Sequence, residues 1–140
     1  MNQFDLKNRT AVITGGAQGL GLGIAKQFIE SGAEVIIWDI DQEIIKKAKQ
    51  QLNSNKLTSQ IVDVADFENV KKNIEEIIIT KKVDIFINNA GITGLTSKLW
   101  NYPIDEWHKV LNVNLNGTFY CCKAIVPHMI KNNYGRIVNV

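Results

Sequence analysis

Short apolar runs alternate with longer segments of helical periodicity along the whole chain. Most of these runs are nearly continuous aliphatic stretches without polar alternation, which is typical of strands buried on both faces of a parallel sheet. The predicted strands cover residues 10–14, 34–39, 58–63, 83–88 and 136–140. Helical patterns at 19–31, 41–52 and 66–81 lie between them. The alternation predicts five βα units in one α/β domain, residues 1–140, with right-handed crossovers.

A fourth helical segment is expected over residues 103–132. Pro103 suits the first turn of a helix, whereas Pro127 has no amide donor and is expected to kink or interrupt it. Residues 112–117 include three asparagines and a glycine, which are poor mid-helix residues, so a local break is expected around Asn114. The irregular stretch 90–102 follows the fourth strand, which places it at the sheet edge where open α/β sheets bind ligands.

The first predicted strand leads directly into a glycine-rich turn, Thr14-Gly15-Gly16-Ala17-Gln18-Gly19-Leu20-Gly21. Glycine lets backbone amides approach an anion without an intervening Cβ. The amides that begin the next helix carry partial positive charge, so the turn suits a phosphate or pyrophosphate. No Gly-Lys-Ser/Thr follows, which excludes a P-loop, and Ile24 stands where a strict G-x-G-x-x-G pattern needs glycine.

Further polar and small residues stand where the other strands end. Asp39 ends the second strand, near the spacing of roughly 20 residues at which an acidic group meets an adenosine ribose. Asp63 and Val64 close the third strand, and Asn88-Asn89-Ala90-Gly91 closes the fourth. For two asparagines a purely structural role stays open. Asn89 could be a buried amide that stabilises the turn, and Asn114, in the fourth helical segment, could be an ordinary helix residue.

Composition excludes several classes of function. The 140 residues are 45% hydrophobic and 21% charged with a net charge of +2, as in an ordinary globular domain. The lysines fall mostly on predicted helices without a basic stripe interleaved with aromatics, so we expect no nucleic-acid partner. No apolar run is long enough to span a membrane, and the N-terminus lacks a secretory layout. Cys121 and Cys122 are adjacent and lack other ligands at metal spacing, which predicts helix packing, no metal and a reducing cytoplasm.

In their order and spacing, these motifs resemble the short-chain dehydrogenase/reductase family over essentially the whole chain. The resemblance rests on Thr14-Gly-x-x-x-Gly19-x-Gly21, Asp39, Asp63-Val64, Asn88-Asn89-Ala90-Gly91, Val113-Asn114-Leu115 and Gly135-Arg136-Ile137-Val138-Asn139. It implies a Rossmann-like doubly wound parallel sheet, truncated here after the fifth strand, that binds a nicotinamide dinucleotide.

The resemblance also implies roles for individual residues. Those implied to bind the cofactor are Thr14, Gly15, Gln18, Gly19, Leu20 and Gly21 around the pyrophosphate, Asp39 at the adenosine ribose, Asp63 and Val64 beside the adenine, and Asn89, Ala90 and Gly91 beside the nicotinamide ribose. Asn114 matches the family's catalytic asparagine, which holds a water in a proton relay. An amide does not titrate near neutral pH, so its role is support of the acid–base residues.

The acid–base residues of the family are a tyrosine, a lysine four positions later and a serine just after the fifth strand. The chain has no such pair, because Tyr102, Tyr120 and Tyr134 are followed four positions later by Glu106, Ala124 and Val138. The sequence also stops inside the fifth predicted strand. We therefore expect an N-terminal part of a longer enzyme, without appreciable turnover by itself.

Asp39 favours NAD over NADP, because a carboxylate accepts hydrogen bonds from free ribose hydroxyls and repels a 2′-phosphate. Gln18 and Ile40 stand where NADP-using members of the family usually carry a cation. The expected reaction interconverts a secondary alcohol and a ketone on a small sugar, sugar-acid, polyol or 3-oxoacyl substrate. The alternatives are an NADPH-dependent 3-oxoacyl-acyl-carrier-protein reductase, a non-catalytic dinucleotide-binding module and, more distantly, a methyltransferase. By family analogy the parent is a homotetramer or homodimer.

Two further expectations concern aromatic and imidazole side chains. Trp100 and Trp107 are expected to pack the irregular stretch onto the sheet rather than to contact substrate. His108 and His128 are expected on helix surfaces, because neither has the carboxylate and nucleophile of a catalytic triad.

Overall fold

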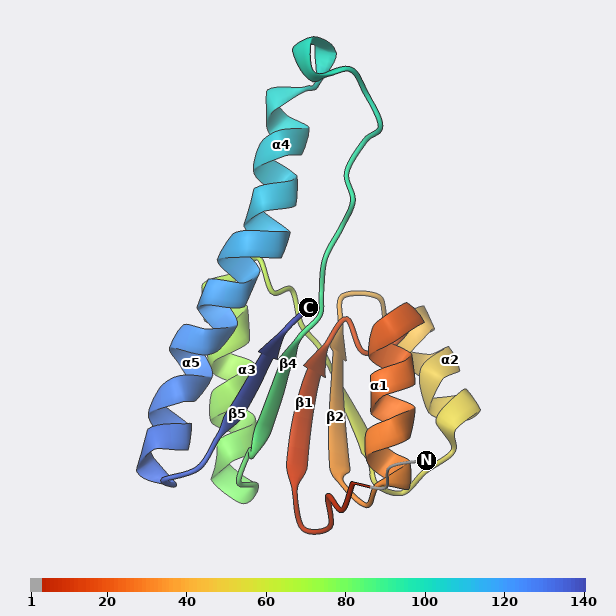
Figure 1. The fold of residues 1–140 in the computed structure, drawn as a ribbon, viewed down its shortest axis with the longest axis vertical. Helices are drawn as coiled ribbons and strands as arrows, with labels where there is room; N and C mark the ends of the chain where they lie inside the picture. The colour runs from red at the N-terminus through yellow and green to blue at the C-terminus, as the bar shows by residue number, and fades with distance from the viewer. Residues whose placement is uncertain (1–3) are drawn as a thin grey trace.

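Five parallel strands form one sheet in the order β3-β2-β1-β4-β5 in the computed structural model, which describes residues 4–140 (Figure 1). The strands are β1 Thr10–Thr14, β2 Glu34–Asp39, β3 Leu57–Ile61, β4 Ile85–Asn88 and β5 Arg136–Asn139. The chain moves outward from β1 to β3 and then returns to build β4 and β5 on the other side. This reversal confirms the predicted doubly wound, Rossmann-like sheet.

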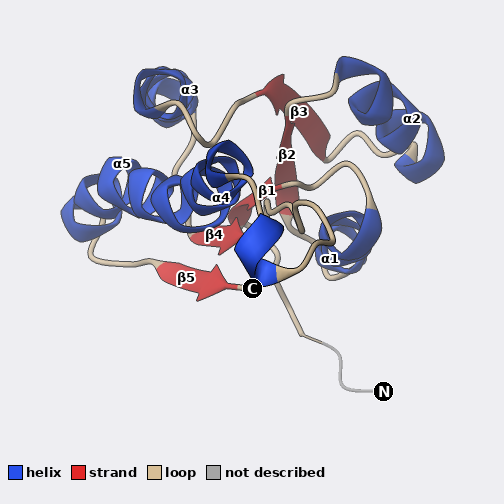
Figure 2. Cartoon of the chain, turned by 90° about the horizontal axis from the view of Figure 1, so that it is seen from above, coloured by secondary structure: helices blue, strands red, loops and turns tan. Residues whose placement is uncertain are grey.

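Helices cover both faces of the sheet (Figure 2). On one face lie α1, Gly19–Glu30, and α2, Gln42–Leu52; on the other lie α3, Phe67–Thr80, and α5, Gly117–Lys131. Successive strand residues point to opposite faces, so Ile13 packs in the α1–α2 core and Val12 in the α3–α5 core. Both residues are fully buried, which explains why the strands read as unbroken aliphatic runs.

Three predicted strands are longer than the observed ones, and one of them, β5, ends at Asn139 rather than at residue 140. β3 ends at Ile61, so Asp63 lies in the turn beyond the strand. The Asp63 amide donates to Asn69 Oδ1 at 2.9 Å, and Asp63 Oδ1 accepts from the Ala65 amide at 2.9 Å. These local bonds replace the next rung of the ladder. β4 begins at Ile85 rather than at residue 83.

The predicted fourth helix is observed in three pieces without a break in the chain of helical turns. α4, Ile104–Leu111, continues into a π-helical turn, η2 Asn112–Asn116, and then into α5. The expected local break is therefore a single wide turn. Pro127 does not interrupt α5, which continues to Lys131. Pro103 occupies the cap position, one residue before α4.

α4 and the preceding short helix η1, Leu99–Asn101, project beyond the sheet (Figure 1). Trp100 is 79% exposed and Trp107 is 55% exposed, so the expectation that both pack onto the sheet is wrong. Tyr102 holds this loop instead, because its hydroxyl accepts from the Leu95 amide at 3.2 Å. Within residues 4–140, no helix combines the length and the hydrophobicity that crossing a bilayer requires.

Candidate functional site

Two glycines in the turn after β1 have different surroundings. Gly19 has φ of +54°, in the left-handed region, and a Cβ there would meet no atom within 4 Å. Gly21 has no such freedom, because a Cβ there would overlap the Gly15 carbonyl oxygen and Asn89 Nδ2. The turn is thus held tightly against β4 at Gly21 and left open at Gly19.

The N-terminus of α1 differs from those of α2 and α3. Asp41 Oδ1 accepts from the first amides of α2 at 2.8 and 3.1 Å, and Asp66 Oδ1 does the same for α3 at 3.0 and 3.2 Å. At α1, the cap residue Gln18 makes no side-chain bond to the described amides, and no acidic residue lies in the first turn. Uncapped amides and an uncompensated helix dipole are what an anionic ligand requires.

Asp39 lies next to this turn, because the Gly16 amide donates to the carbonyl oxygen of Trp38 at 3.0 Å. The half-buried Asp39 carboxylate accepts through Oδ1 from the amides of Ile40, at 2.9 Å, and Asp41, at 3.4 Å. In the described part of the chain, its second oxygen has no hydrogen-bond partner. This carboxylate is therefore oriented by its own backbone and keeps one oxygen free to accept from a ligand.

Thr14 and Asn89 join the glycine turn to the end of β4. The Thr14 hydroxyl oxygen accepts from the amides of Asn89, at 3.0 Å, and Ala90, at 2.9 Å. In return, Asn89 Nδ2 donates to the carbonyls of Thr14, at 3.0 Å, and Gly15, at 3.1 Å. The structural interpretation of Asn89 as an amide that stabilises the turn is confirmed.

Asn114 lies in the π-helical turn and pairs with the loop after β4. Its Oδ1 accepts from the Ile92 amide at 2.8 Å, and its Nδ2 donates to the Ile92 carbonyl at 2.9 Å. Its backbone carbonyl accepts from the Thr118 hydroxyl at 3.1 Å. Asn114 is thus more than a surface helix residue, because it fixes the loop from across the site.

A cleft of about 500 Å³ opens where these elements meet, at the carboxyl ends of the strands. The predicted site residues that line it are Gly15, Gln18, Leu20, Asp39, Asp63, Val64, Asn89, Ala90 and Gly91. Thr14, Gly19, Gly21 and Asn114 are absent from this lining. Thr14 is buried beneath the turn and Gly21 is packed against Gly15, so both act from behind the surface.

Five lining residues were not predicted from the sequence: Ile40, Val62, Ile92, Lys109 and Val113. Ile40, Val62, Ile92 and Val113 each immediately neighbour a predicted residue in the sequence, so inspection of neighbouring positions could have found them. Lys109 belongs to none of the sequence motifs. Its place in the cleft depends on how α4 rises over the sheet.

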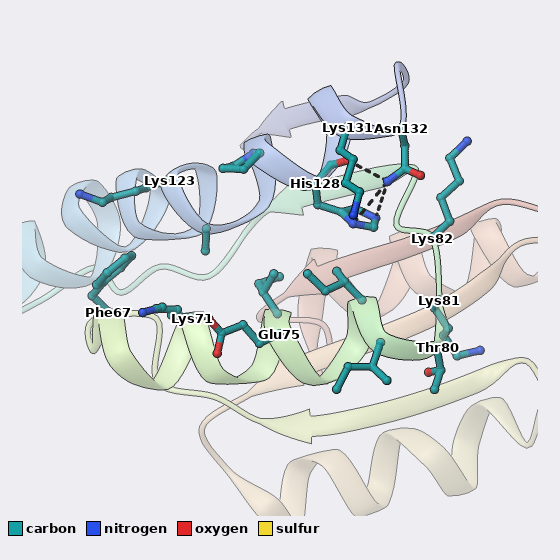
Figure 3. Close-up of a pocket in the computed structure, with 15 residues that line it drawn as sticks. Phe67, Lys71, Glu75, Thr80, Lys81, Lys82, Lys123, His128, Lys131 and Asn132 are labelled. Atoms are coloured by element: carbon teal, nitrogen blue, oxygen red, sulfur yellow. Dashed lines mark hydrogen bonds between the residues drawn. The ribbon is translucent and has the colours of Figure 1, made fainter.

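A larger hollow of about 950 Å³ runs between α3 and α5, and no predicted site residue lines it (Figure 3). Lysines and isoleucines form most of its wall. It lies away from the glycine turn and the strand ends, so we do not assign the site to it.

His128 lies at this hollow and is less exposed than the helix-surface position expected from the sequence. It is half-buried, and its Nε2 accepts from the Val83 amide at 3.1 Å, which joins α5 to the chain just before β4. Burial lowers the pKa of His128 from its ordinary value, and the nearby charges of Lys131 and Lys82 lower it further. His108, by contrast, is exposed as expected.

The cysteines behave as packing residues. Burial, followed by the neighbouring Cys122, raises the pKa of the Cys121 thiol to about 12, so no reactive thiolate forms there at neutral pH. No cluster of metal-ligating side chains occurs among residues 4–140.

Comparison with known proteins places the chain in a family. The family model for short chain dehydrogenase matches residues 9–140. The 2-dehydro-3-deoxy-L-rhamnonate dehydrogenase (NAD(+)) of Sphingomonas sp. (strain SKA58) is 38% identical over 133 residues, which are 94% of this chain and 53% of that enzyme. The 3-oxoacyl-(acyl-carrier-protein) reductase FabG of Chlamydia muridarum is 38% identical over 139 residues, which are 96% and 56% of the two chains.

A solved structure agrees with these relatives. NAD+-bound xylitol dehydrogenase superposes with a TM-score of 0.91 at 31% identity, over 96% of this chain and 53% of that one. The chain spans about half the length of the curated relatives it matches. The sequence match, the doubly wound sheet and the glycine turn agree, and the chain belongs to the short-chain dehydrogenase family.

Proposed function

We propose that this chain is the cofactor-binding part of an NAD-dependent oxidoreductase that interconverts a secondary alcohol and a ketone. The observation that carries the proposal is the arrangement of Asp39 beside the glycine turn. Its carboxylate lines the same cleft as Gly15 and Gln18, and one of its oxygens is free.

The residues of the cleft fit a nicotinamide dinucleotide in charge and in shape. Donors at the uncapped start of α1 suit the two negative charges of a pyrophosphate, and the open space at Gly19 admits it. Asp39 accepts from the adenosine ribose hydroxyls, while Asp63 and Val64 border the adenine. Ala90 and Gly91, tied down through Thr14 and Asn89, border the nicotinamide ribose. The bound nicotinamide supplies the hydride acceptor or donor.

Asn114 acts in this proposal as a positioning residue. Both ends of its side-chain amide bond to Ile92, so it holds the loop that passes the nicotinamide end of the cleft. Acid–base chemistry needs a titratable group, and the chain contains no tyrosine with a lysine four positions later. We propose that the 140 residues bind cofactor without appreciable turnover.

The choice of NAD rests on charge. Asp39 would lie against the 2′-phosphate of NADP, and neither Gln18 nor Ile40 offers a compensating cation. The relative named for NAD(+) and the NAD+-bound structural neighbour support this choice. The second candidate is an NADPH-linked 3-oxoacyl reductase, because the 3-oxoacyl-(acyl-carrier-protein) reductase relative is 38% identical to this chain. Asp39 disfavours this candidate. A small hydroxylated sugar, sugar acid or polyol is the substrate class that we propose.

Asp39→Asn tests the proposal. The amide oxygen still accepts from Ile40, so the turn is retained while the charge is removed. We expect NAD affinity to fall by about tenfold, as for loss of a charge-assisted hydrogen bond, and the gap between NAD and NADP to narrow. Isothermal titration calorimetry of the chain with each dinucleotide measures both effects.

Glu30→Gln is the matched control, because it removes an exposed carboxylate at the far end of α1. It should leave both affinities unchanged. Tighter binding of NADP than of NAD by the wild-type chain would overturn the cofactor assignment. Hydride transfer to NAD from a polyol by the 140 residues alone would contradict the binding-only role.

A further inference from the structure

Lys109 is the single basic side chain among the described residues that line the cleft, where the other charged residues are Asp39 and Asp63. It belongs to the last turn of α4 and is exposed. Its side chain forms no ion pair or hydrogen bond with any residue in the range 4–140, although its backbone carbonyl accepts from the Asn112 amide. Its ammonium group is therefore free to donate to a ligand in the cleft.

The helix places Lys109 on the side of the cleft that faces the turn after β3. Gly117 packs so closely on the turn after β3 that a Cβ there would lie 2.9 Å from Val64 Cγ2. Residues four apart share a helix face, so Val113 and then Lys109 lie on the same face as Gly117, toward the N-terminus of α4. Both line the cleft, as Val64 does, and α4 continues above the strand ends (Figure 1). Lys109 therefore overhangs the end of the cleft that holds Asp63.

Asp63 and Lys109 offer opposite hydrogen-bonding groups to a ligand at this end. Asp63 Oδ1 accepts from the Ala65 amide, which orients the carboxylate and leaves its other oxygen without a described partner. Lys109 has three N–H donors and no acceptor. The two side chains are not paired with each other, so a ligand edge would satisfy both only if its donor faces Asp63 and its acceptor faces Lys109.

We propose that Lys109 reads the adenine base of the cofactor, donating a hydrogen bond to ring nitrogen N1 while Asp63 accepts from the 6-amino group. This inference rests on the proposed dinucleotide function of the cleft. Hypoxanthine has a carbonyl in place of the amino group and an N–H at N1, so it presents the reverse pattern. A site that hydrogen-bonds one pattern discriminates against the other, because its polar groups are then left unpaired.

Calorimetric titration with NAD and with nicotinamide hypoxanthine dinucleotide tests the assignment. We expect the wild-type chain to bind NAD about tenfold more tightly than the hypoxanthine dinucleotide. Lys109→Met should weaken NAD binding by about fivefold or more and leave the hypoxanthine dinucleotide nearly unaffected, because that base does not use the lysine. Lys109→Arg should retain most of the preference. Lys72→Met, on the exposed face of α3, is the matched control and should bind both like the wild type.

The outcomes separate this inference from the proposed function. If Lys109→Met binds NAD as tightly as the wild type, Lys109 is a solvated surface residue and the inference is overturned while the NAD site stands. If the affinities for both dinucleotides fall equally, the lysine acts on the pyrophosphate charge and base reading is overturned. A wild-type chain that binds neither dinucleotide contradicts the proposed function itself.

Discussion

Single residues in the glycine turn are constrained in different ways. Gly21 is required for space, since it touches Gly15 and Asn89, whereas Gly23, two positions later on α1, has open space within 4 Å of where a Cβ would lie. Sequence spacing marks both as glycines after a strand. The contacts of Gly21 with the Gly15 carbonyl and with Asn89, just after β4, distinguish them in the structure, so their substitution should have opposite effects.

Gly21→Ala is expected to lower the free energy of unfolding by about 1–3 kcal/mol, because overpacking forces the turn away from Asn89. Gly23→Ala is the matched control and should raise it by about 0.5–1 kcal/mol, because alanine loses less backbone entropy in a helix. Urea denaturation followed by circular dichroism measures both. Equal stability of the two variants would contradict the close packing at Gly21.

At the scale of elements, α5 is anchored to the sheet by more than its apolar face. Cys121, Ile125 and Met129 are buried against the sheet. His128 adds a polar bond from α5 to the Val83 amide, before β4. An imidazolium has no free acceptor nitrogen, so this bond requires the neutral form.

The lowered pKa of His128 makes stability depend on pH. In the unfolded chain His128 titrates near its ordinary value of about 6.5, and in the folded chain it titrates lower. The stabilising effect is therefore complete above pH 6.5 and is lost as the pH falls from there toward the folded pKa, where the unfolded state binds more protons. Asp84 opposes the shift and Lys82 and Lys131 favour it.

His128→Gln should flatten the decline in unfolding free energy between pH 7 and pH 5, measured by urea titration at each pH. His108→Gln is the control, since His108 is exposed on α4. The same slope in His128→Gln and in the wild type would show that His128 does not carry the effect.

At the scale of the whole molecule, an ion pair ties β1 to β4 at the edge opposite the cleft. Asp84, 3% exposed, accepts from Arg9 at 2.9 Å through Oδ1 and from the Thr10 amide at 3.1 Å through Oδ2. These bonds join segments far apart in sequence at the centre of the sheet. Glu34 pairs with Lys81 at the same edge, but both of those side chains are substantially exposed.

Asp84→Ala is expected to lower the unfolding free energy by about 2 kcal/mol or more, because it leaves a buried amide and a half-buried guanidinium unpaired. Glu34→Ala removes the exposed partner of Lys81 and should cost less than about 1 kcal/mol. The midpoints of urea denaturation, at unchanged m-values, measure the loss of unfolding free energy in each variant. A smaller loss for Asp84→Ala than for Glu34→Ala would contradict the central role of this ion pair.

Local pattern was enough to predict the strands, the first three helices, the glycine turn and the acidic residue at the end of β2. These features depend on residues close together in the sequence, where periodicity and turn chemistry act directly. The β3 boundary was misplaced because Asn69, from the next helix, caps the chain at Asp63.

Tertiary structure alone decided the rest. Several features depend on how distant segments are arranged in space. They are the pairing of Asn114 with Ile92, the bond from Val83 to His128, the exposure of Trp100 and Trp107, and the place of Lys109 in the cleft. Sequence determined which elements form, because helix and strand preferences are local. Which side chains meet was decided only when α5 packed on a face of the sheet and α4 extended beyond the carboxyl ends of the strands, because the residues near each partner in the sequence do not indicate the other.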